Sequence, residues 1–149
     1  MAPYRRVVVG TDGSETATAA VRQAAELAGA SDAELVIVTA YVPEHASPDP
    51  NGEAPEEIRW RLTDVGEAEE HADAARQAAH EAGAKKVRIR AEQGDAADVL
   101  IDVAEDTGAG CIVVGSRGMA STSRFILGSV PNRVSHHAPC DVLIVHTTS

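Results

Sequence analysis

Residues 111–118 read Cys-Ile-Val-Val-Gly-Ser-Arg-Gly, an apolar run that ends in a glycine-containing turn. No polar residue interrupts the run, as expected of a strand that is buried on both faces of a sheet. A similar run, Val-Val-Val-Gly at residues 7–10, lies near the N-terminus and also ends in glycine. Strands of this kind occur in parallel sheets with helices on both sides. These two stretches therefore predict an α/β fold.

The rest of the chain alternates between strand and helix patterns. We expect strands at residues 6–10, 34–42, 86–91, 111–115 and 141–146, and helices at 14–28, 58–82, 95–107 and 129–137, with Gly29 closing the first helix. Basic residues alternate with apolar ones in 86–91, which predicts an edge strand. Right-handed crossovers then give a single doubly wound, five-stranded, mainly parallel sheet with helices on both faces. One domain accounts for residues 1–149, and the proline-rich stretch 43–55 reads as a surface loop.

The chain carries a formal net charge of −10, from 13 Lys and Arg against 23 Asp and Glu. Such a surface repels nucleic-acid phosphates, so we expect no DNA or RNA partner. No apolar run is long enough to span a bilayer, and the N-terminus lacks the apolar core of a signal peptide, so we expect a cytoplasmic protein without membrane contact. Cys111 and Cys140 lie in or beside apolar runs and read as small core residues.

Ligands of doubly wound sheets bind at the carboxyl ends of the strands, where the strand order reverses. The first and fourth strands are the natural neighbours at that point. Their carboxyl ends are Gly10-Thr11-Asp12 and Gly115-Ser116. Both glycine turns therefore converge on one crevice in the predicted fold.

The second of these turns has a regular glycine spacing: Gly115, Gly118, nine further residues, then Gly128 and Ser129. Glycine lets backbone N–H groups approach an anion closely, and Ser129 stands where a helix would begin. A helix N-terminus offers unpaired N–H donors and a partial positive charge, which favours a phosphate group. No lysine follows the glycines as in a Walker A loop, and the dinucleotide fingerprint belongs after a first strand.

This spacing resembles the Gly-x2-Gly-x9-Gly-Ser/Thr pattern of nucleotide-binding universal stress proteins. Two further blocks carry the resemblance, Val-Val-Val-Gly-Thr-Asp-Gly-Ser at residues 7–14 and His-His-Ala-Pro-Cys-Asp-Val-Leu-Ile-Val at 136–145. The resemblance extends over essentially the whole chain. It implies strand order 3-2-1-4-5, and it makes 43–55 a region of free variation.

The resemblance also implies a homodimer that binds ATP or a related adenine nucleotide. Asp12 would contact the adenosine part, and backbone groups around Thr39 and Ala40 would line the adenine pocket. The last strand, 141–146, would pair with its copy in a second subunit. The candidate binding residues are Thr11, Asp12, Thr39, Ala40, Gly115, Ser116, Arg117, Gly118, Gly128, Ser129 and Val130.

The residues alone leave several alternatives open. Asp12 either contacts the ligand or only closes the turn before the helix. Arg117 and Arg124 either pair with phosphate oxygens or keep the loop solvated. The nucleotide is ATP, with Mg²⁺ as its companion, or else AMP or cyclic AMP. The protein is a stress or signalling sensor or regulator, a cyclic AMP or AMP sink, a slow ATP hydrolase or an interaction scaffold. No catalytic residue or metal ligand is assigned, since His136 and His137 end a helix and adjacent residues do not share a face.

Overall fold

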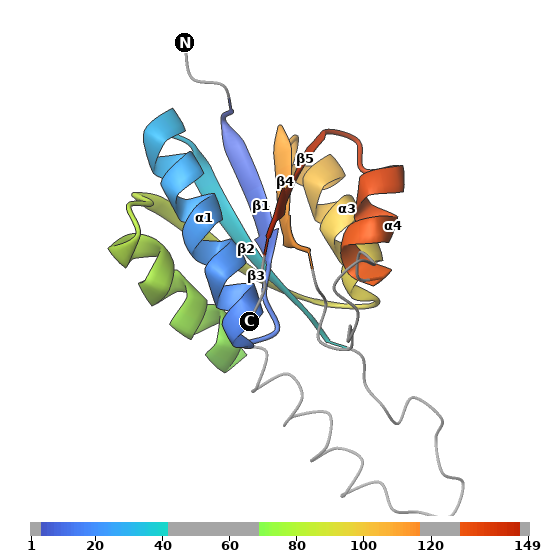
Figure 1. Ribbon diagram of the computed structural model, residues 1–149, viewed down its shortest axis with the longest axis horizontal. Helices are drawn as coiled ribbons and strands as arrows, with labels where there is room; N and C mark the ends of the chain where they lie inside the picture. Colours follow the sequence, from blue (N-terminus) through green and yellow to red (C-terminus); the bar gives the residue numbers. More distant parts are fainter. Residues whose placement is uncertain (1–3, 42–68, 117–128, 147–149) are drawn as a thin grey trace, which may run out of the picture.

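The computed structural model describes residues 4–41, 69–116 and 129–146 (Figure 1). In chain order the elements are β1 (Arg6–Gly10), α1 (Glu15–Ser31), β2 (Glu34–Tyr41), a helical segment at 69–81, β3 (Lys86–Gln93), α3 (Ala96–Thr107), β4 (Cys111–Gly115), α4 (Ser129–His137) and β5 (Asp141–Val145). The strands form one sheet in the order β3-β2-β1-β4-β5, and every pair is parallel. This confirms the predicted α/β fold and its strand order.

Helices cover both faces of the sheet. α1 and the helical segment 69–81 pack on one face, and α3 and α4 pack on the other (Figure 1). In β1, Val7 and Val9 enter the first layer of the core and Val8 enters the second, and all three are fully buried. Each such valine contributes about 1.5–3 kcal/mol by leaving water. Continuous apolar runs are thus explained by burial on both sides of the sheet.

Helix α1 ends later than its glycine predicted. We expected Gly29 to close the helix, but the helix continues to Ser31, and Asp32 is the C-cap in the left-handed region at φ 53°. The Asp32 N–H group satisfies the carbonyls of Ala28 and Gly29. Gly29 has a different role: a Cβ at this position would lie 2.5 Å from the Gly83 carbonyl oxygen. The glycine is needed for close packing of the chain against α1.

The two edges of the sheet are formed by β3 and β5. β3 is an edge strand as predicted, but it runs to Gln93 because its last residues pair with the end of β2 at Tyr41. Its Arg90 guanidinium contacts the carboxylates of Glu92 at 2.7 Å and Asp106 at 2.9 Å. These acidic groups raise the pKa of Arg90.

The N-terminal segment is fixed to the first residue of β5. The Tyr4 hydroxyl donates a hydrogen bond to the Asp141 carboxylate at 2.9 Å. Cys111 and Cys140 are free thiols whose pKa values are raised mainly by burial, in agreement with their predicted role as core residues. Among the described helices, none combines the length and apolar character that a bilayer span requires.

Candidate functional site

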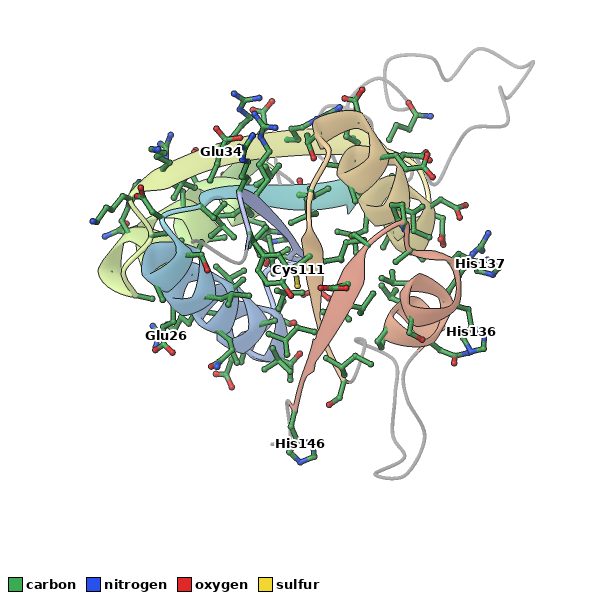
Figure 2. All side chains as sticks on the ribbon, turned by 90° about the horizontal axis from the view of Figure 1, so that it is seen from above. Glu26, Glu34, Cys111, His136, His137 and His146 are labelled. Carbon is green, nitrogen blue, oxygen red and sulfur yellow. The ribbon has the colours of Figure 1, made fainter. Side chains whose placement is uncertain are left out.

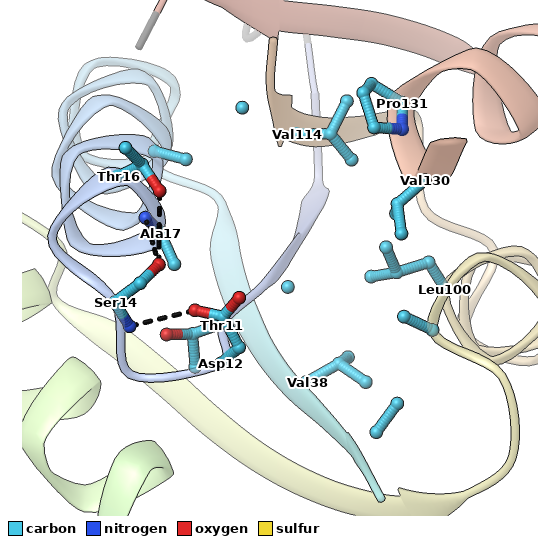
Figure 3. A pocket seen from close by; sticks show the side chains of 15 residues that line it. Thr11, Asp12, Ser14, Thr16, Ala17, Val38, Leu100, Val114, Val130 and Pro131 are labelled. Atoms are coloured by element: carbon cyan, nitrogen blue, oxygen red, sulfur yellow. Dashed lines mark hydrogen bonds between the residues drawn. The ribbon is translucent and has the colours of Figure 1, made fainter. Parts of the chain in front are cut away.

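A cavity of about 200 Å³ opens at the carboxyl ends of β1, β2 and β4 (Figure 3). It lies between the start of α1 on one side and the starts of α3 and α4 on the other. Its lining comprises Gly10, Thr11, Asp12, Ser14, Thr16, Ala17, Ala20, Val38, Ala40, Ala96, Leu100, Val114, Gly115, Val130 and Pro131. β1 and β4 are neighbours in the sheet, so the two predicted strand ends do meet at one crevice.

The turn between β1 and α1 forms the polar side of the cavity. The Thr11 N–H group donates to the Val38 carbonyl at 2.9 Å and ties the turn to β2. Within the turn, Gly13 N–H donates to Thr11 Oγ1 at 3.2 Å, and Ser14 N–H donates to Asp12 Oδ1 at 2.8 Å. Asp12 therefore closes an Asx-turn and also lines the cavity.

Helix α1 begins at the rim of this cavity. Its N-cap Ser14 accepts a hydrogen bond from the Ala17 N–H group at 3.2 Å, and the Ser14 hydroxyl lies 3.1 Å from Thr16 Oγ1. Both Thr16 and Ala17 line the cavity. The first turn of a helix presents N–H donors and the positive end of its dipole, while the Asp12 carboxylate on the same side adds a negative charge, so this side of the cavity favours a polar group with hydrogen-bond donors and acceptors.

The opposite side of the cavity is apolar. Val38, Leu100, Val114, Val130 and Pro131 face it from β2, α3, β4 and α4 (Figure 3). A cavity with apolar walls and a few polar groups at one side suits a flat ring system that carries a polar or anionic substituent. Its position at the strand ends is the one that doubly wound folds use for ligands.

A match to a protein-family model identifies the family of this chain. Residues 3–146 match the model of the universal stress protein family. The chain belongs to this family. The match confirms the resemblance seen in the glycine spacing and in the terminal blocks.

Individual universal stress proteins resemble the chain over nearly its full length. Universal stress protein Rv1636 of Mycobacterium tuberculosis is 42% identical over 148 residues, which cover 99% of this chain and 100% of the relative. The crystal structure of a universal stress protein in complex with cAMP has a TM-score of 0.74 and 36% identity, and the match covers 97% of this chain and 98% of the other. A universal stress protein from Archaeoglobus fulgidus, solved in complex with dAMP, has a TM-score of 0.68 and 25% identity, with 97% and 98% covered.

Five of the residues named from the sequence line the cavity of this universal stress protein, namely Thr11, Asp12, Ala40, Gly115 and Val130. Three others are described but do not line it. The Thr39 side chain points to the opposite face of the sheet. Thr39 is buried, with 2% of its surface exposed, and its Oγ1 has no hydrogen-bond partner among the described atoms. Ser116 N–H donates to the Val145 carbonyl at 2.7 Å, and Ser129 is the exposed first residue of α4. Arg117, Gly118, Arg124 and Gly128 lie outside the described residues.

Most of the apolar lining of the cavity, apart from Ala40 and Val130, was not identified from the sequence. Val38 lies two positions before Ala40 on β2, so the two-residue period of a strand places both on the cavity side. This period also explains why Thr39, between them, faces away. Leu100 and Pro131 carried no distinguishing signal, because an apolar residue of a helix that lines a cavity reads like any core residue.

The histidines at the end of α4 do not join the cavity. His136 and His137 project from the surface of the molecule, and their ring centroids are 6.4 Å apart (Figure 2). Within the described ranges, no group of three or more His, Cys, Asp or Glu side chains is arranged to hold a metal ion.

Proposed function

We propose that this universal stress protein binds an adenine nucleotide in the cavity at the strand ends and acts as a cytoplasmic stress or signalling regulator. The observation that carries the proposal is the division of the cavity into an apolar wall and a polar rim at the start of α1. The apolar wall suits a base, and the polar rim suits the hydroxyl groups of a ribose, because the Asp12 carboxylate lies there. The complexes of two universal stress proteins with cAMP and dAMP support the assignment.

The apolar wall is the proposed site of the adenine ring, between Val38 and Ala40 of β2 and Leu100 of α3. Asp12 lies at the rim and is the proposed contact of the adenosine part, besides its hydrogen bond within the turn. Backbone groups near Thr39 remain part of the proposal, although its side chain faces away.

The glycine motif is the proposed site of the ribose and phosphates. Gly115 and Val130 line the cavity from β4 and α4, and Ser129 begins α4. The other proposed members of this group are Thr11, Ser116, Arg117, Gly118 and Gly128. Among the described lining residues Asp12 is the single carboxylate, so a Mg²⁺ ion that accompanies ATP would take most of its ligands from phosphate and water.

ATP is the first candidate, because the glycine motif extends over the length that a triphosphate needs. AMP or cyclic AMP is the second candidate, and the solved relatives in complex with cAMP and dAMP favour it. Either ligand acts by stabilising the conformation that binds it more tightly. A slow hydrolysis of ATP would add turnover to the same site.

The experiment is to purify the protein, extract the small molecule bound to it and identify that molecule by mass spectrometry. Calorimetric titrations with ATP, ADP, AMP and cyclic AMP then rank the candidates, and GTP serves as the control for base recognition. We expect dissociation constants in the micromolar range, about −8 kcal/mol of binding free energy. Incubation with ATP and Mg²⁺, followed by phosphate detection, tests hydrolysis. If no adenine nucleotide binds more tightly than GTP, the assignment is wrong.

We also propose that the protein is a homodimer through β5. This strand is an edge of the sheet, and it carries two exposed large apolar residues, Leu143 at 38% and Ile144 at 37% exposure. Pairing with a second copy would cover them and remove the open edge. Light scattering should show a dimer, and Ile144→Lys should give a monomer. Gln93→Lys on the opposite edge is the matched control and should leave the dimer intact.

A further inference from the structure

The imidazole of His71 packs on the backbone of Gly13, in the turn that forms the polar rim of the cavity. A Cβ built on Gly13 would lie 2.5 Å from His71 Cδ2, 2.6 Å from Nε2 and 2.8 Å from Cγ. Gly13 also has φ +83°, in the left-handed region that side chains rarely adopt. The backbone angle favours glycine at this position, and a side chain here would also displace the ring of His71.

Neither His71 nor Gly13 lines the cavity. Asp12 and Ser14 line the cavity, whereas Gly13 between them does not. The helical segment 69–81, which carries His71, lies at the lower left of the close view, beyond the turn as seen from the cavity (Figure 3, pale green). His71 thus supports from outside a turn whose inner side is proposed to meet the nucleotide.

Hydrogen bonds hold the first half of the turn. The Thr11 N–H group donates to the Val38 carbonyl at 2.9 Å and ties the first residue of the turn to β2. Two internal hydrogen bonds, from Gly13 N–H to Thr11 Oγ1 and from Ser14 N–H to Asp12 Oδ1, fix neighbouring residues relative to one another. The ring of His71 adds a contact with a separate element at Gly13, in the middle of the turn.

The element that carries His71 is itself held in place. Ala72 and Ala79 on the helical segment are fully buried, and Ala79 belongs to the core cluster that also contains residues of α1 and the sheet residues Val7 and Val9. At the far end of α1, the Gly83 carbonyl closely approaches Gly29. The chain from 69 to 84 therefore contacts both the turn before α1 and the last turns of α1, so that His71 is presented from a fixed position.

We propose that His71 is a positioning residue for nucleotide binding. Its ring holds the turn in the conformation that directs Asp12 and Ser14 to the cavity. This inference rests on the proposed function. Because coupling between two sites is reciprocal, a nucleotide in the cavity also stabilises the packing of the helical segment 69–81.

The first test compares two histidines on the same helical segment. His71→Ala should weaken binding of ATP and cyclic AMP about tenfold, within the range that contacts between neighbouring residues contribute. His71→Phe keeps a ring over Gly13 and should restore most of the affinity. His80→Ala is the matched control: His80 Nδ1 lies 3.0 Å from the Ala84 carbonyl oxygen, away from the turn. It should lower the melting temperature and leave the affinity unchanged.

The second test measures whether nucleotide binding stabilises the helical segment 69–81. Saturating ATP or cyclic AMP should slow amide hydrogen exchange in residues 72–81 of the wild-type protein, and His71→Ala should reduce this protection at equal saturation. If His71→Ala binds nucleotide as tightly as the wild type, the positioning role is refuted and the proposed function stands. If His71→Phe binds as weakly as His71→Ala, the ring contact is not the cause. If the wild type binds no adenine nucleotide, both the proposed function and this inference fail.

Discussion

Asp12 accepts a hydrogen bond from the Ser14 backbone N–H group at 2.8 Å while it lines the cavity, so one carboxylate both stabilises the turn and faces the proposed ligand site. An amide oxygen can replace the carboxylate in the turn but carries no charge. Asp12→Asn should therefore keep the free energy of unfolding and weaken nucleotide binding. Asp12→Ala should weaken binding too, and should lower the free energy of unfolding by about 1 kcal/mol. Denaturant unfolding and calorimetry give the two readouts, and nucleotide affinity unchanged in both variants would remove Asp12 from the ligand contacts.

Gly115 lines the cavity in a backbone conformation that a side chain can adopt. It lines the cavity at the end of β4 and is not among the described glycines with positive φ, so a side chain is compatible with its backbone. Gly115→Ala should retain the melting temperature of the free protein and lower the affinity for nucleotide, because the methyl group occupies part of a cavity of about 200 Å³. Calorimetry measures the affinity, and thermal unfolding without ligand is the control. Unchanged affinity would show that no nucleotide approaches this strand end closely.

Asp32 is the C-cap of α1 at φ 53°, in the left-handed region. Glycine adopts this region without a Cβ penalty but gains entropy in the unfolded chain. Relief of the Cβ penalty should outweigh the added entropy of the unfolded chain, so Asp32→Gly should raise the free energy of unfolding by about 0.5 kcal/mol. Asp32→Ala keeps the Cβ and loses the tolerance of Asp for this conformation, so it should lower the free energy of unfolding. Denaturant titration measures the free energy of unfolding of both variants. The prediction is wrong if Asp32→Ala is the more stable variant.

The Tyr4 hydroxyl makes the free energy of unfolding depend on pH in the alkaline range. The hydrogen bond to Asp141, together with burial, raises the pKa of Tyr4 from 10.0 to about 12. The folded state favours the neutral phenol, so this contribution to stability is complete below pH 10.0 and is lost as pH rises through about 12. Tyr4→Phe should reduce this loss, whereas Tyr41→Phe, the control on β2, should not. Denaturant unfolding across this pH range, with the ultraviolet absorbance of the phenolate as a second probe, measures the effect.

The sequence predicted the order of elements because each has its own local pattern. The errors arose where a contact distant in sequence decided the outcome. Gly29 was expected to end α1, but it allows the Gly83 carbonyl to approach the helix. β3 extends to Gln93 because β2 offers partners as far as Tyr41. Neither contact can be predicted from the residues that flank Gly29 or the end of β3.

The candidate site was predicted in part, for a related reason. Asp12 and Gly115 could be found because they follow the first and fourth strands, whose carboxyl ends were expected to meet where the strand order reverses, and because both lie in blocks that carry the family resemblance. Leu100 and Pro131 could not, since a cavity wall and a closed core use the same side chains. The contact between His71 and Gly13 was also missed, because the two residues come from elements whose spatial arrangement the sequence pattern leaves open.

The pairing of β1 with β4 determines when the cavity forms during folding. Val9 and Val113 are register partners although more than a hundred positions separate them in the chain. Contacts of such long range form only after the entropy of closing the intervening chain has been overcome, which makes them slow. A nascent chain that holds β1, β2 and β3 alone has no cavity. The proposed nucleotide would thus bind only molecules in which β4 and α4 have joined the sheet, and during synthesis its binding would mark a late step of folding.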